Sequence, residues 1–489
     1  MNKSIKNLEP NQLWNHFAEL NAVPRPSKKE ERIIAFMLNF GKSLELETIQ
    51  DEIGNIIIKK PATVGMENRA TVCLQSHLDM VHQKNAATPF DFLTQGIEME
   101  VVGDFVKAKG TTLGADNGIG VASIMAVLSS TAIEHPAIEA LFTIDEETGM
   151  TGALGLKGGL LSADYMLNLD TEEDSELTIG CAGGIDVTAS GHYTTEPLGA
   201  DYIAYKILLT GLTGGHSGMD IHKGRGNANM IMNTLIMQVD RLGGRIITMD
   251  GGSLRNAIPR ESTVEIAIPT LQKDAFEQLI IEQQRKLKEE QFPADPNLNL
   301  AIQPSTTSLL ALDSGFQHKL LRAVSVLING VYAMSAEIKD LVQTSNNVAR
   351  ILIKDEKFCI QCLTRSSVDG EKMMLANELK NTLELVSSHI TLTGSYPGWT
   401  PKPESFIVKL MADLYKELFQ KDAHVNACHA GLECGILGAH YPNMEMISFG
   451  PNITGAHSPD EKVQISSVQK FWSYLLETLK RIPESTSLN

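Results

Sequence analysis

The sequence predicts an α/β fold in which one domain is interrupted by a second, α+β domain. Segments typical of strands alternate with segments of helical spacing through residues 1–187, and several of the strands end in polar residues. This alternation indicates a sheet whose ligands lie beyond the carboxyl ends of its strands. The pattern changes near residue 188 and returns after the proline-rich segment 394–405. We therefore expect the interrupted domain to comprise 1–187 and 396–489, with the insertion spanning 188–395.

The interrupted domain begins with two helical segments and then alternates between strands and helices. Helical spacing covers 12–20, 30–40, 121–130, 406–419 and 468–482. Strands are predicted at 44–50, 55–60, 71–76, 140–144, 165–169 and 444–449, with a hairpin over 96–110. A glycine-rich loop precedes the helix that begins at 121. The order agrees with a single α/β sheet that the chain leaves and re-enters.

Two runs of the insertion each follow the order β-α-β-β-α. The first run is predicted over 202–212, 226–242, 245–250, 263–269 and 275–290. The second is predicted over 297–304, 316–328, 348–355, 358–365 and 371–386. The repeated order of elements predicts an insertion built of two similar halves, the product of an internal duplication.

Composition and charge exclude several classes of protein. The net charge of −17, from 42 basic and 59 acidic residues, disfavours binding to nucleic acid or to an anionic membrane. No apolar run reaches the roughly 18 residues of a membrane span, and residues 1–17 lack the apolar region of a signal peptide. The six cysteines are irregularly spaced, and the pair Cys359 and Cys362 lies within a predicted strand with no second pair. We expect free thiols in a soluble cytoplasmic protein.

Histidines and acids occupy five loops that follow the predicted strands of the interrupted domain. The segment TIDEETG, 143–149, holds three consecutive acids and no basic residue, so a proton or a cation must relieve their repulsion. Two histidines with several carboxylates suit Zn²⁺, Mn²⁺ or Co²⁺ better than Ca²⁺. The loops together predict a site for two divalent cations. The candidate residues are His77 and Asp79, Asp116, Glu146 and Glu147, Asp170, and His457.

The spacing predicts some roles and leaves others open. Asp116 is the natural bridge between two cations, because Gly114 and Gly118 allow the backbone to approach closely. Of Glu146 and Glu147, one can bind a cation while the other acts as general base, and spacing does not choose between them. Taken singly, each candidate is also compatible with an ordinary core histidine, a turn residue or an acid at a helix start.

Six motifs together give the sequence a family resemblance. They are SHLDMV, GTTLGADNGIG, TIDEETG, LNLDTEE, GGHSGMDIHKGRGNAN and GPNITGAHSPDE. Their order and spacing resemble the dinuclear-zinc metallopeptidase family of carboxypeptidase G, aminoacylase and carnosinase, and within it the bacterial aminoacyl-histidine dipeptidase (peptidase D) type. The resemblance covers the full length. It implies a mixed-sheet zinc-peptidase catalytic domain interrupted by an α+β lid domain.

The resemblance also implies a role for each residue of the site. One metal would be held by His77 and Asp170, the other by Glu147 and His457, with Asp116 bridging the two. Glu146 would be the general base, and Asp79 the carboxylate that orients His77. The family commonly has a basic residue soon after the bridging aspartate, whereas Asn117 follows here. Contacts to substrate near that position therefore stay open.

Residues of the insertion and of one later loop are candidates for contacts to substrate. The resemblance makes His216 the lid histidine that stabilises the tetrahedral oxyanion. Arg365 suits a C-terminal carboxylate, because its guanidinium fork binds bidentately. The further candidates are Asn256, Arg365 and, in the loop HAGLECG, Glu433. The sequence is equally compatible with ordinary surface residues at these positions.

The expected function is hydrolysis of Xaa-His and other unblocked dipeptides by a cytoplasmic metallopeptidase. The expected cofactors are two divalent ions, Zn²⁺ before Mn²⁺ or Co²⁺, and the expected partner is a small peptide, with no nucleic acid and no membrane. A homodimer is compatible with the sequence. The alternatives are a tripeptidase, an N-acyl-amino-acid deacylase or a metal-binding scaffold without activity.

Overall fold

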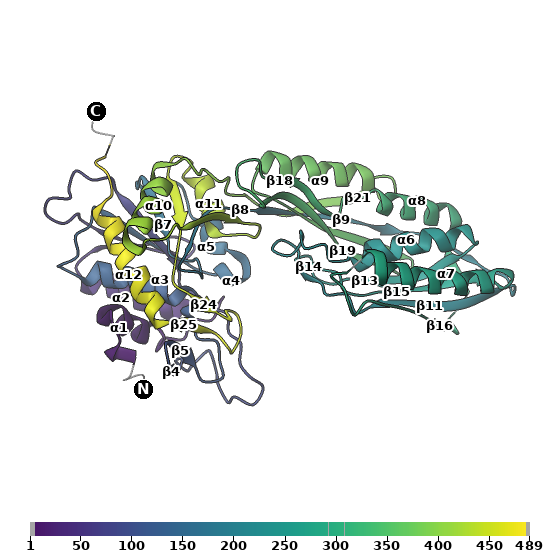
Figure 1. Cartoon of the computed structure of the whole chain (residues 1–489), viewed down its shortest axis with the longest axis horizontal. Helices are drawn as coiled ribbons and strands as arrows, with labels where there is room; N and C mark the ends of the chain where they lie inside the picture. The colour runs from purple at the N-terminus through teal and green to yellow at the C-terminus, as the bar shows by residue number, and fades with distance from the viewer. Residues whose placement is uncertain (1–4, 292, 308, 486–489) are drawn as a thin grey trace. The chain divides into compact units, whose positions relative to one another are not determined.

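Two units, each with its own large sheet, make up the described part of the chain (Figure 1). The structure is a computed structural model that describes residues 5–291, 293–307 and 309–485. Residues up to Gly180, 401–427 and those from Leu432 onward form the first unit, and residues 181–400 and 428–431 form the second. The domain boundaries expected from the sequence, at 187 and 396, remain a prediction.

The centre of the first unit is a mixed sheet whose middle strands are apolar and buried. These strands are β3 (Val72–His77), β6 (Ile138–Thr143) and β7 (Tyr165–Asn168), and every residue of β3 and β6 is buried. β3 pairs in parallel with both β6 and β7. Such continuous apolar runs are typical of strands that are buried on both faces. The carboxyl ends of the three strands therefore meet at one edge of the sheet.

Five further strands complete this sheet in the order β1-β2-β6-β3-β7-β23-β8-β22. They are β1 (Glu47–Gln50), β2 (Ile56–Lys60), β8 (Glu176–Cys181), β22 (His424–Cys428) and β23 (Glu445–Ser448). The last two come from the end of the chain, and β23 pairs in parallel with β7. A small antiparallel sheet has the order β24-β25-β5-β4 and comprises β4 (Met99–Val102), β5 (Phe105–Ala108), β24 (Ile453–Thr454) and β25 (Lys462–Gln464).

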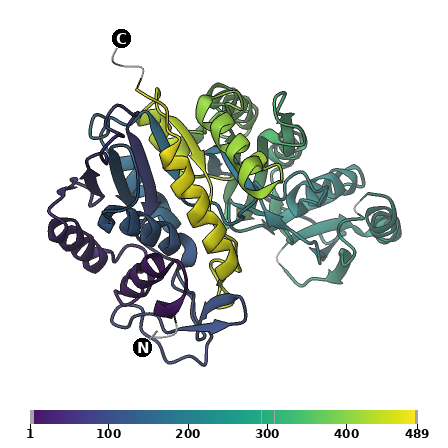
Figure 2. The same ribbon diagram turned by 60° about the vertical axis from the view of Figure 1, so that its left-hand side comes forward.

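Helices pack on the sheet of the first unit. α3 (Ala115–Ser129) lies against β3 and α1 (Asn11–Leu20), and 13 of its 15 residues are buried, so it has no polar face. α12 (Ile465–Lys480), the long yellow helix of Figure 2, packs on α10 (Phe406–Phe419), which also contacts β23. The remaining helices are α2 (Glu31–Ser43), α4 (Glu146–Gly149), α5 (Thr151–Gly155) and α11 (Glu433–His440).

The second unit is built on a nine-stranded sheet with the order β16-β11-β15-β13-β19-β20-β9-β21 and with β18 attached to β19. Its strands are β9 (Gly183–His192), β11 (Tyr202–Thr210), β13 (Arg245–Gly251), β15 (Ser262–Pro269), β16 (Asn299–Pro304), β18 (Gly330–Met334), β19 (Val342–Lys354), β20 (Lys357–Ser366) and β21 (His389–Tyr396). Two short pairs lie outside it, β10 (Thr195–Pro197) with β17 (Leu310–Leu312), and β12 (Gly215–His216) with β14 (Ala257–Ile258).

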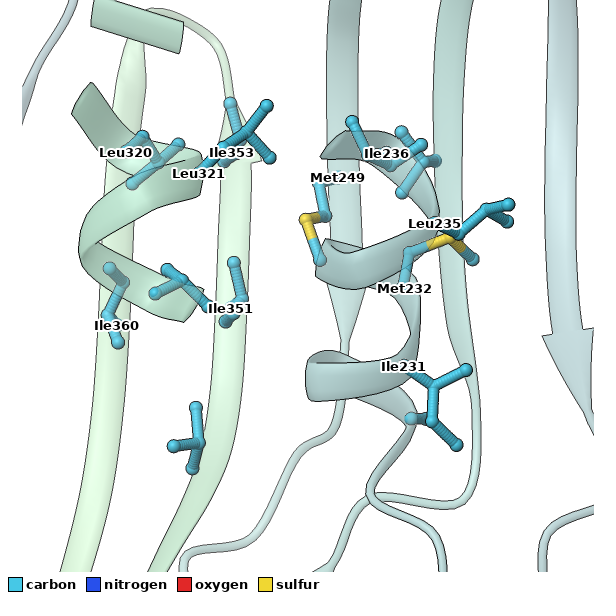
Figure 3. Packing of buried hydrophobic residues seen from close by; sticks show 14 of the residues in the cluster. Ile231, Met232, Leu235, Ile236, Met249, Leu320, Leu321, Ile351, Ile353 and Ile360 are labelled. Atoms are coloured by element: carbon cyan, nitrogen blue, oxygen red, sulfur yellow. The ribbon is translucent and has the colours of Figure 1, made fainter. Parts of the chain in front are cut away.

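Apolar stripes on its helices form the core of the second unit. The helices are α6 (Ala228–Arg241), α7 (Lys273–Lys286), α8 (Ser314–Ser325) and α9 (Asp369–Leu383). Figure 3 shows Ile231, Met232, Leu235 and Ile236 of α6 beside Met249 of β13, and Leu320 and Leu321 of α8 beside residues of β19 and β20. The positions in α6 recur at intervals of one, three and four, which places them on one helix face. Among the described residues, no helix is both long enough and apolar enough to cross a membrane.

Strand pairing divides the second unit into two halves of equal topology. One half runs β11-α6-β13-β15-α7-β16, and its strands lie in the order β16-β11-β15-β13. The other runs β9-α8-β19-β20-α9-β21, with strands in the order β19-β20-β9-β21. The two halves join where β13 pairs with β19. The first half is therefore inserted between β9 and α8 of the second.

This pairing corrects the composition of the halves that the sequence predicted. The strand at 297–304 was expected to open the second half, but β16 pairs with β11 and closes the first. The second half opens with β9, which pairs with β20 and β21. Cys359 and Cys362 both lie in β20, and their separation of three residues directs their side chains to opposite faces. Both are free thiols, as expected.

Candidate active site

The site residues of the first unit lie just beyond the carboxyl ends of β3, β6 and β7. β3 ends at His77, which is in register with Thr143 at the end of β6. Asp79, the pair Glu146 and Glu147, and Asp170 follow these strands within four residues. The first turn of α3 supplies Asp116, and the loop between β24 and β25 supplies His457. Loops that are far apart in the sequence thus meet at one edge of the sheet, as expected for α/β folds.

Asp116 lies between the two histidines and offers one oxygen to each. Its Oδ1 is 3.1 Å from Nε2 of His77, and its Oδ2 is 3.1 Å from Nε2 of His457. Nε2 of His77 is also 3.5 Å from Oδ1 of Asp170, and Nε2 of His457 is 3.0 Å from Oε2 of Glu147. The structure therefore forms two groups of three possible ligands that share Asp116.

The donor set of these two groups fits a pair of divalent cations. Each group combines one imidazole nitrogen with two carboxylates, a set that suits Zn²⁺ and neighbouring transition metals. Oε1 of Glu147 is buried and has no hydrogen-bond partner in the part of the chain that the structure describes. A buried carboxylate oxygen without a donor is costly unless a cation or a proton binds it.

Without a cation, protonation of His77 and His457 offsets the negative charge of the neighbouring carboxylates. Hydrogen bonds to Asp116 and Glu147 raise the pKa of His457 to about 11, although burial opposes the shift. Burial lowers the pKa of His77, but Asp170 and Asp116 outweigh it and bring that pKa well above its ordinary value. Burial acts against Asp116 as well, yet His457 and His77 lower its pKa. A cation placed between the same atoms would replace these protons.

Asp79 links His77 to the segment that carries the two glutamates. It is completely buried, and its Oδ1 lies 3.3 Å from Nδ1 of His77. It also accepts hydrogen bonds from the backbone N–H groups of Glu146 (3.0 Å) and Glu147 (3.3 Å). Asp79 therefore contacts no cation position directly, and it sets the direction of Nε2 of His77 through the opposite ring nitrogen.

Glu146 lies beside the cation positions as a half-buried carboxylate. One of its oxygens groups with His77 and Glu147. Burial raises its pKa well above the ordinary value; His77 opposes this shift, and the carboxylates Asp170, Glu433 and Glu147 add to it. A carboxylate with a raised affinity for a proton is suited to general base chemistry.

Glu433 begins α11 and is buried in a polar network between strands. Its Oε2 accepts from Nε2 of Gln75 at 2.7 Å and from Oγ1 of Thr143 at 2.6 Å. Only 1% of the residue is exposed, and burial raises its pKa to about 7. Gln75 in turn accepts from Asn168 of β7, so the network crosses three strands behind the cation groups. The contact to substrate that the sequence suggested for Glu433 remains a prediction.

His216, Asn256 and Arg365 lie near one another in the second unit. The backbone N–H of Ser217 donates to the carbonyl of Asn256 at 2.7 Å, next to the β12–β14 pair. Arg365 is 5% exposed and donates to Oγ of Ser217 at 3.5 Å and to the hydroxyl of Tyr396 at 2.9 Å. The side chain of Asn256 is exposed.

Sequence reasoning missed several residues that support the site. Nδ2 of Asn117 donates to the carbonyl of Leu169 at 2.8 Å and also contacts Asp170. Arg25 and Glu461 form hydrogen bonds to backbone groups of the site loops. Glu461 was detectable in principle, since it ends the motif GPNITGAHSPDE four residues after His457.

The comparison with known families agrees with this geometry. The model of peptidase family M20/M25/M40 matches residues 73–481. The chain belongs to this family. This M20 peptidase is 42% identical to the cytosol non-specific dipeptidase of Escherichia coli (strain K12), over 98% of the chain and 99% of that protein. The family and the peptidase D type expected from the motifs are thereby confirmed.

Solved structures show the same fold. The crystal structure of aminoacylhistidine dipeptidase from Vibrio alginolyticus superimposes with a TM-score of 0.93 at 42% identity and covers 99% of each chain. The aminopeptidase PepT from Bacillus cereus matches with a TM-score of 0.57 and 16% identity, over 97% of this chain and 99% of that one. The second match bears on the fold alone.

Proposed function

We propose that this M20 peptidase is a metal-dependent dipeptidase that hydrolyses unblocked dipeptides, including Xaa-His. The observation that carries the proposal is the position of Asp116, with one oxygen facing each histidine of two otherwise separate ligand groups. The two relatives of 42% identity support the substrate class, since one is a non-specific dipeptidase and the other an aminoacylhistidine dipeptidase. A cytosolic location is part of the proposal, and the name of the Escherichia coli relative supports it.

Five residues are assigned to the cations in this proposal. One cation would be held by His77 and Asp170 and the other by His457 and Glu147, and Asp116 would contribute to both. Zn²⁺ is the first choice, and Mn²⁺ or Co²⁺ are compatible with the same ligands. The chemistry that such cations would supply is a lowered pKa, toward about 7, for a water molecule and polarisation of the peptide carbonyl.

The remaining steps belong to residues of the chain. Glu146 takes the proton of the attacking water and passes it to the nitrogen of the leaving amine. Its raised pKa, caused chiefly by burial, supports this role. Asp79 keeps His77 in the orientation in which Nε2 faces Asp116. Asp79 also accepts hydrogen bonds from the backbone N–H groups of Glu146 and Glu147, and these bonds keep Glu146 in place.

His216 is proposed to donate a hydrogen bond to the oxyanion. Its Nδ1 accepts from the backbone N–H groups of Gly218 at 3.2 Å and Met219 at 3.1 Å, so the ring proton resides on Nε2. Burial and the nearby Arg365 lower its pKa and keep the ring neutral. The ring therefore presents one N–H in a fixed direction, which is the property that an oxyanion donor needs. The predicted role of the second unit as a lid stays part of this proposal.

Arg365 is proposed to bind the C-terminal carboxylate of the peptide. The hydroxyl of Tyr396 and Oγ of Ser217 hold its guanidinium, and burial strengthens any charged contact that it makes. Arg365→Lys removes the fork and should raise KM for dipeptides much more than it lowers kcat.

The general base can be tested with Glu146→Gln and a matched control. Glu173→Gln changes an exposed glutamate of the nearby LNLDTEE motif. We expect Glu146→Gln to bind two cations and to lose roughly 10²–10⁴-fold in kcat, because general base catalysis contributes that much. The control should retain full activity. Undiminished hydrolysis by Glu146→Gln with two bound cations would refute the assigned base.

Substrate class is tested with a panel of peptides and metals. Purified protein is loaded with Zn²⁺, Mn²⁺ or Co²⁺ and assayed on dipeptides that include β-Ala-His, on tripeptides and on acetyl-amino acids. Preference for dipeptides supports the proposal, and preference for either of the other two classes indicates a tripeptidase or a deacylase. Hydrolysis of none of them would favour a metal-binding scaffold. Sedimentation of the same sample distinguishes a monomer from a homodimer.

A further inference from the structure

One carboxylate binds four consecutive backbone N–H groups of the loop that carries Asp116. Oε2 of Glu461 accepts from Leu113 at 2.7 Å and from Gly114 at 3.0 Å. Oε1 of the same residue accepts from Ala115 at 2.7 Å and from Asp116 itself at 3.2 Å. The first N–H groups of a helix have no partner within the helix, and Glu461 satisfies those of Ala115 and Asp116 at the start of α3. The residue is 2% exposed, so water does not compete for these bonds.

Glu461 also connects this loop to the second histidine of the site. It lies four residues after His457, in the short segment that leads into β25. The segment therefore contacts Asp116 twice. The imidazole of His457 contacts Oδ2 of Asp116, and the carboxylate of Glu461 accepts from the backbone N–H of Asp116. The distance between a cation ligand and the shared aspartate thus depends on a residue that touches neither cation position.

A buried guanidinium holds the opposite side of the same loop. Nη2 of Arg25 donates to the carbonyl of Gly114 at 2.6 Å, and Nη1 donates to the carbonyls of Leu78 at 3.2 Å and Asp79 at 3.1 Å. The loop of Asp116 is thereby tied to the segment that follows His77. Gly114 is required here, because it has a φ of 68° and because a Cβ atom would lie 2.5 Å from Nη2 of Arg25.

The charge of Arg25 is balanced at a distance. Arg25 is 1% exposed, and it donates hydrogen bonds to three backbone carbonyls. These carbonyls are uncharged, so none of them is a counter-ion for the guanidinium. Burial lowers the pKa of Arg25 to about 10, and four carboxylates of the site oppose this shift, namely Glu461, Asp79, Asp116 and Glu147. Gly114 thus donates its N–H to a carboxylate and presents its carbonyl to a guanidinium, so opposite charges hold the two sides of one residue.

We propose that Glu461 and Arg25 are positioning residues that hold Asp116 at the place where it can bridge the two cations. Glu461 sets Asp116 against His457, and Arg25 sets the same loop against the segment of His77 and Asp79. The inference rests on the proposed two-cation site. It adds that the spacing of the two cation positions is determined by backbone contacts from outside the ligand set.

The experiment uses Glu461→Gln, with Glu139→Gln as the matched control. An amide at position 461 places an NH₂ group against backbone N–H donors and loses acceptors on that side. Glu139 is also a buried carboxylate of the first unit that accepts backbone N–H groups, from Ser162 at 2.8 Å and Ala163 at 3.1 Å. It lies near the amino end of β6, whereas the site lies beyond the carboxyl end.

The readouts are cation affinity by competition with a chelator and the visible spectrum of the Co²⁺-loaded protein. We expect Glu461→Gln to bind the cations about 10–100-fold more weakly, as for other residues that orient ligands, and to change the Co²⁺ spectrum. Glu139→Gln should lower Tm and leave affinity and spectrum unchanged. Wild-type affinity and spectrum in Glu461→Gln would overturn the proposal, as would an equal loss of affinity in the control.

Further variants keep the proposal testable if Glu461→Gln does not fold. Glu461→Asp keeps the carboxylate but is shorter by one methylene, so it cannot reach all four N–H groups. Arg25→Lys keeps the charge, but a single ammonium group cannot donate to the carbonyl of Gly114 and to those of Leu78 and Asp79 at the same time. Both should weaken cation binding, and wild-type binding by both would refute the inference. Failure of the wild-type protein to bind two cations would instead refute the proposed function.

Discussion

Binding of two cations should release about two protons near pH 7. The site holds one proton on each of two histidines when no cation is present, since the pKa of His457 is raised to about 11 and that of His77 lies well above its ordinary value. With a pKa of about 11, only about one His457 ring in 10⁴ is free of its proton at pH 7. A nitrogen must lose its proton to bind a cation. The affinity for each cation should therefore fall about ten-fold for each unit of pH decrease.

Isothermal titration of the metal-free protein with Zn²⁺ measures this count directly. Titrations in two buffers of different ionisation enthalpy give the number of protons released per protein molecule. His457→Ala should release about one proton fewer, because it removes one of the two protonated rings. His318→Gln, a change to an exposed histidine of the second unit, should leave the count unaltered. A release of less than one proton by the wild type would refute the reasoning.

Three further predictions concern single residues. His77→Ala should empty one cation position and abolish hydrolysis, whereas Asp79→Ala should keep more metal and lose most activity; equal metal loss in metal analysis of both would contradict their different roles. Because the pKa of Glu433 is raised to about 7 in the fold, its contribution to stability is present at low pH and is lost as pH rises from about 4.5 to 7. Glu433→Gln should therefore gain stability relative to the wild type above pH 7, by roughly 3 kcal/mol, and calorimetry of the metal-free protein would show no such gain if the reasoning is wrong. Burial lowers the pKa of His429 to about 3, so its stabilising effect is present above about pH 6.5 and is lost as pH falls toward 3. His429→Asn should accordingly flatten the acid part of the unfolding profile, and an unchanged profile would count against it.

The residues of the site that the sequence predicted share one property, which is their position after a strand or at a helix start. Parallel strands bring their carboxyl ends together, so His77, Glu147 and Asp170 were expected to meet before any contact was known. Arg25 and Glu461 have backbone atoms as partners. Backbone groups are the same at every position, so no pattern of residue types indicates which ones a side chain will bind.

The order of elements in the insertion was predicted well, but their grouping was not. Periodicity identifies a strand from its own residues, whereas the neighbour of that strand depends on hydrogen bonds with distant segments. β16 was grouped with the helix that follows it, yet it pairs with β11. β9 was not among the strands predicted for either half, yet Gly191 pairs with Phe358. Sequential elements are neighbours in most folds, and this nested arrangement departs from that rule.

The nested halves of the second unit have a consequence for synthesis on the ribosome. The half from β11 to β16 is continuous in the chain, so it can fold as soon as it has emerged. β9 emerges earlier, but the strands with which it pairs, β20 and β21, are synthesised later. The completed half presents β13 as a template on which β19 can pair, and the sheet then grows outward to β20, β9 and β21. We expect this protein to fold from its middle toward its ends, with the first unit completed only when α12 has been made.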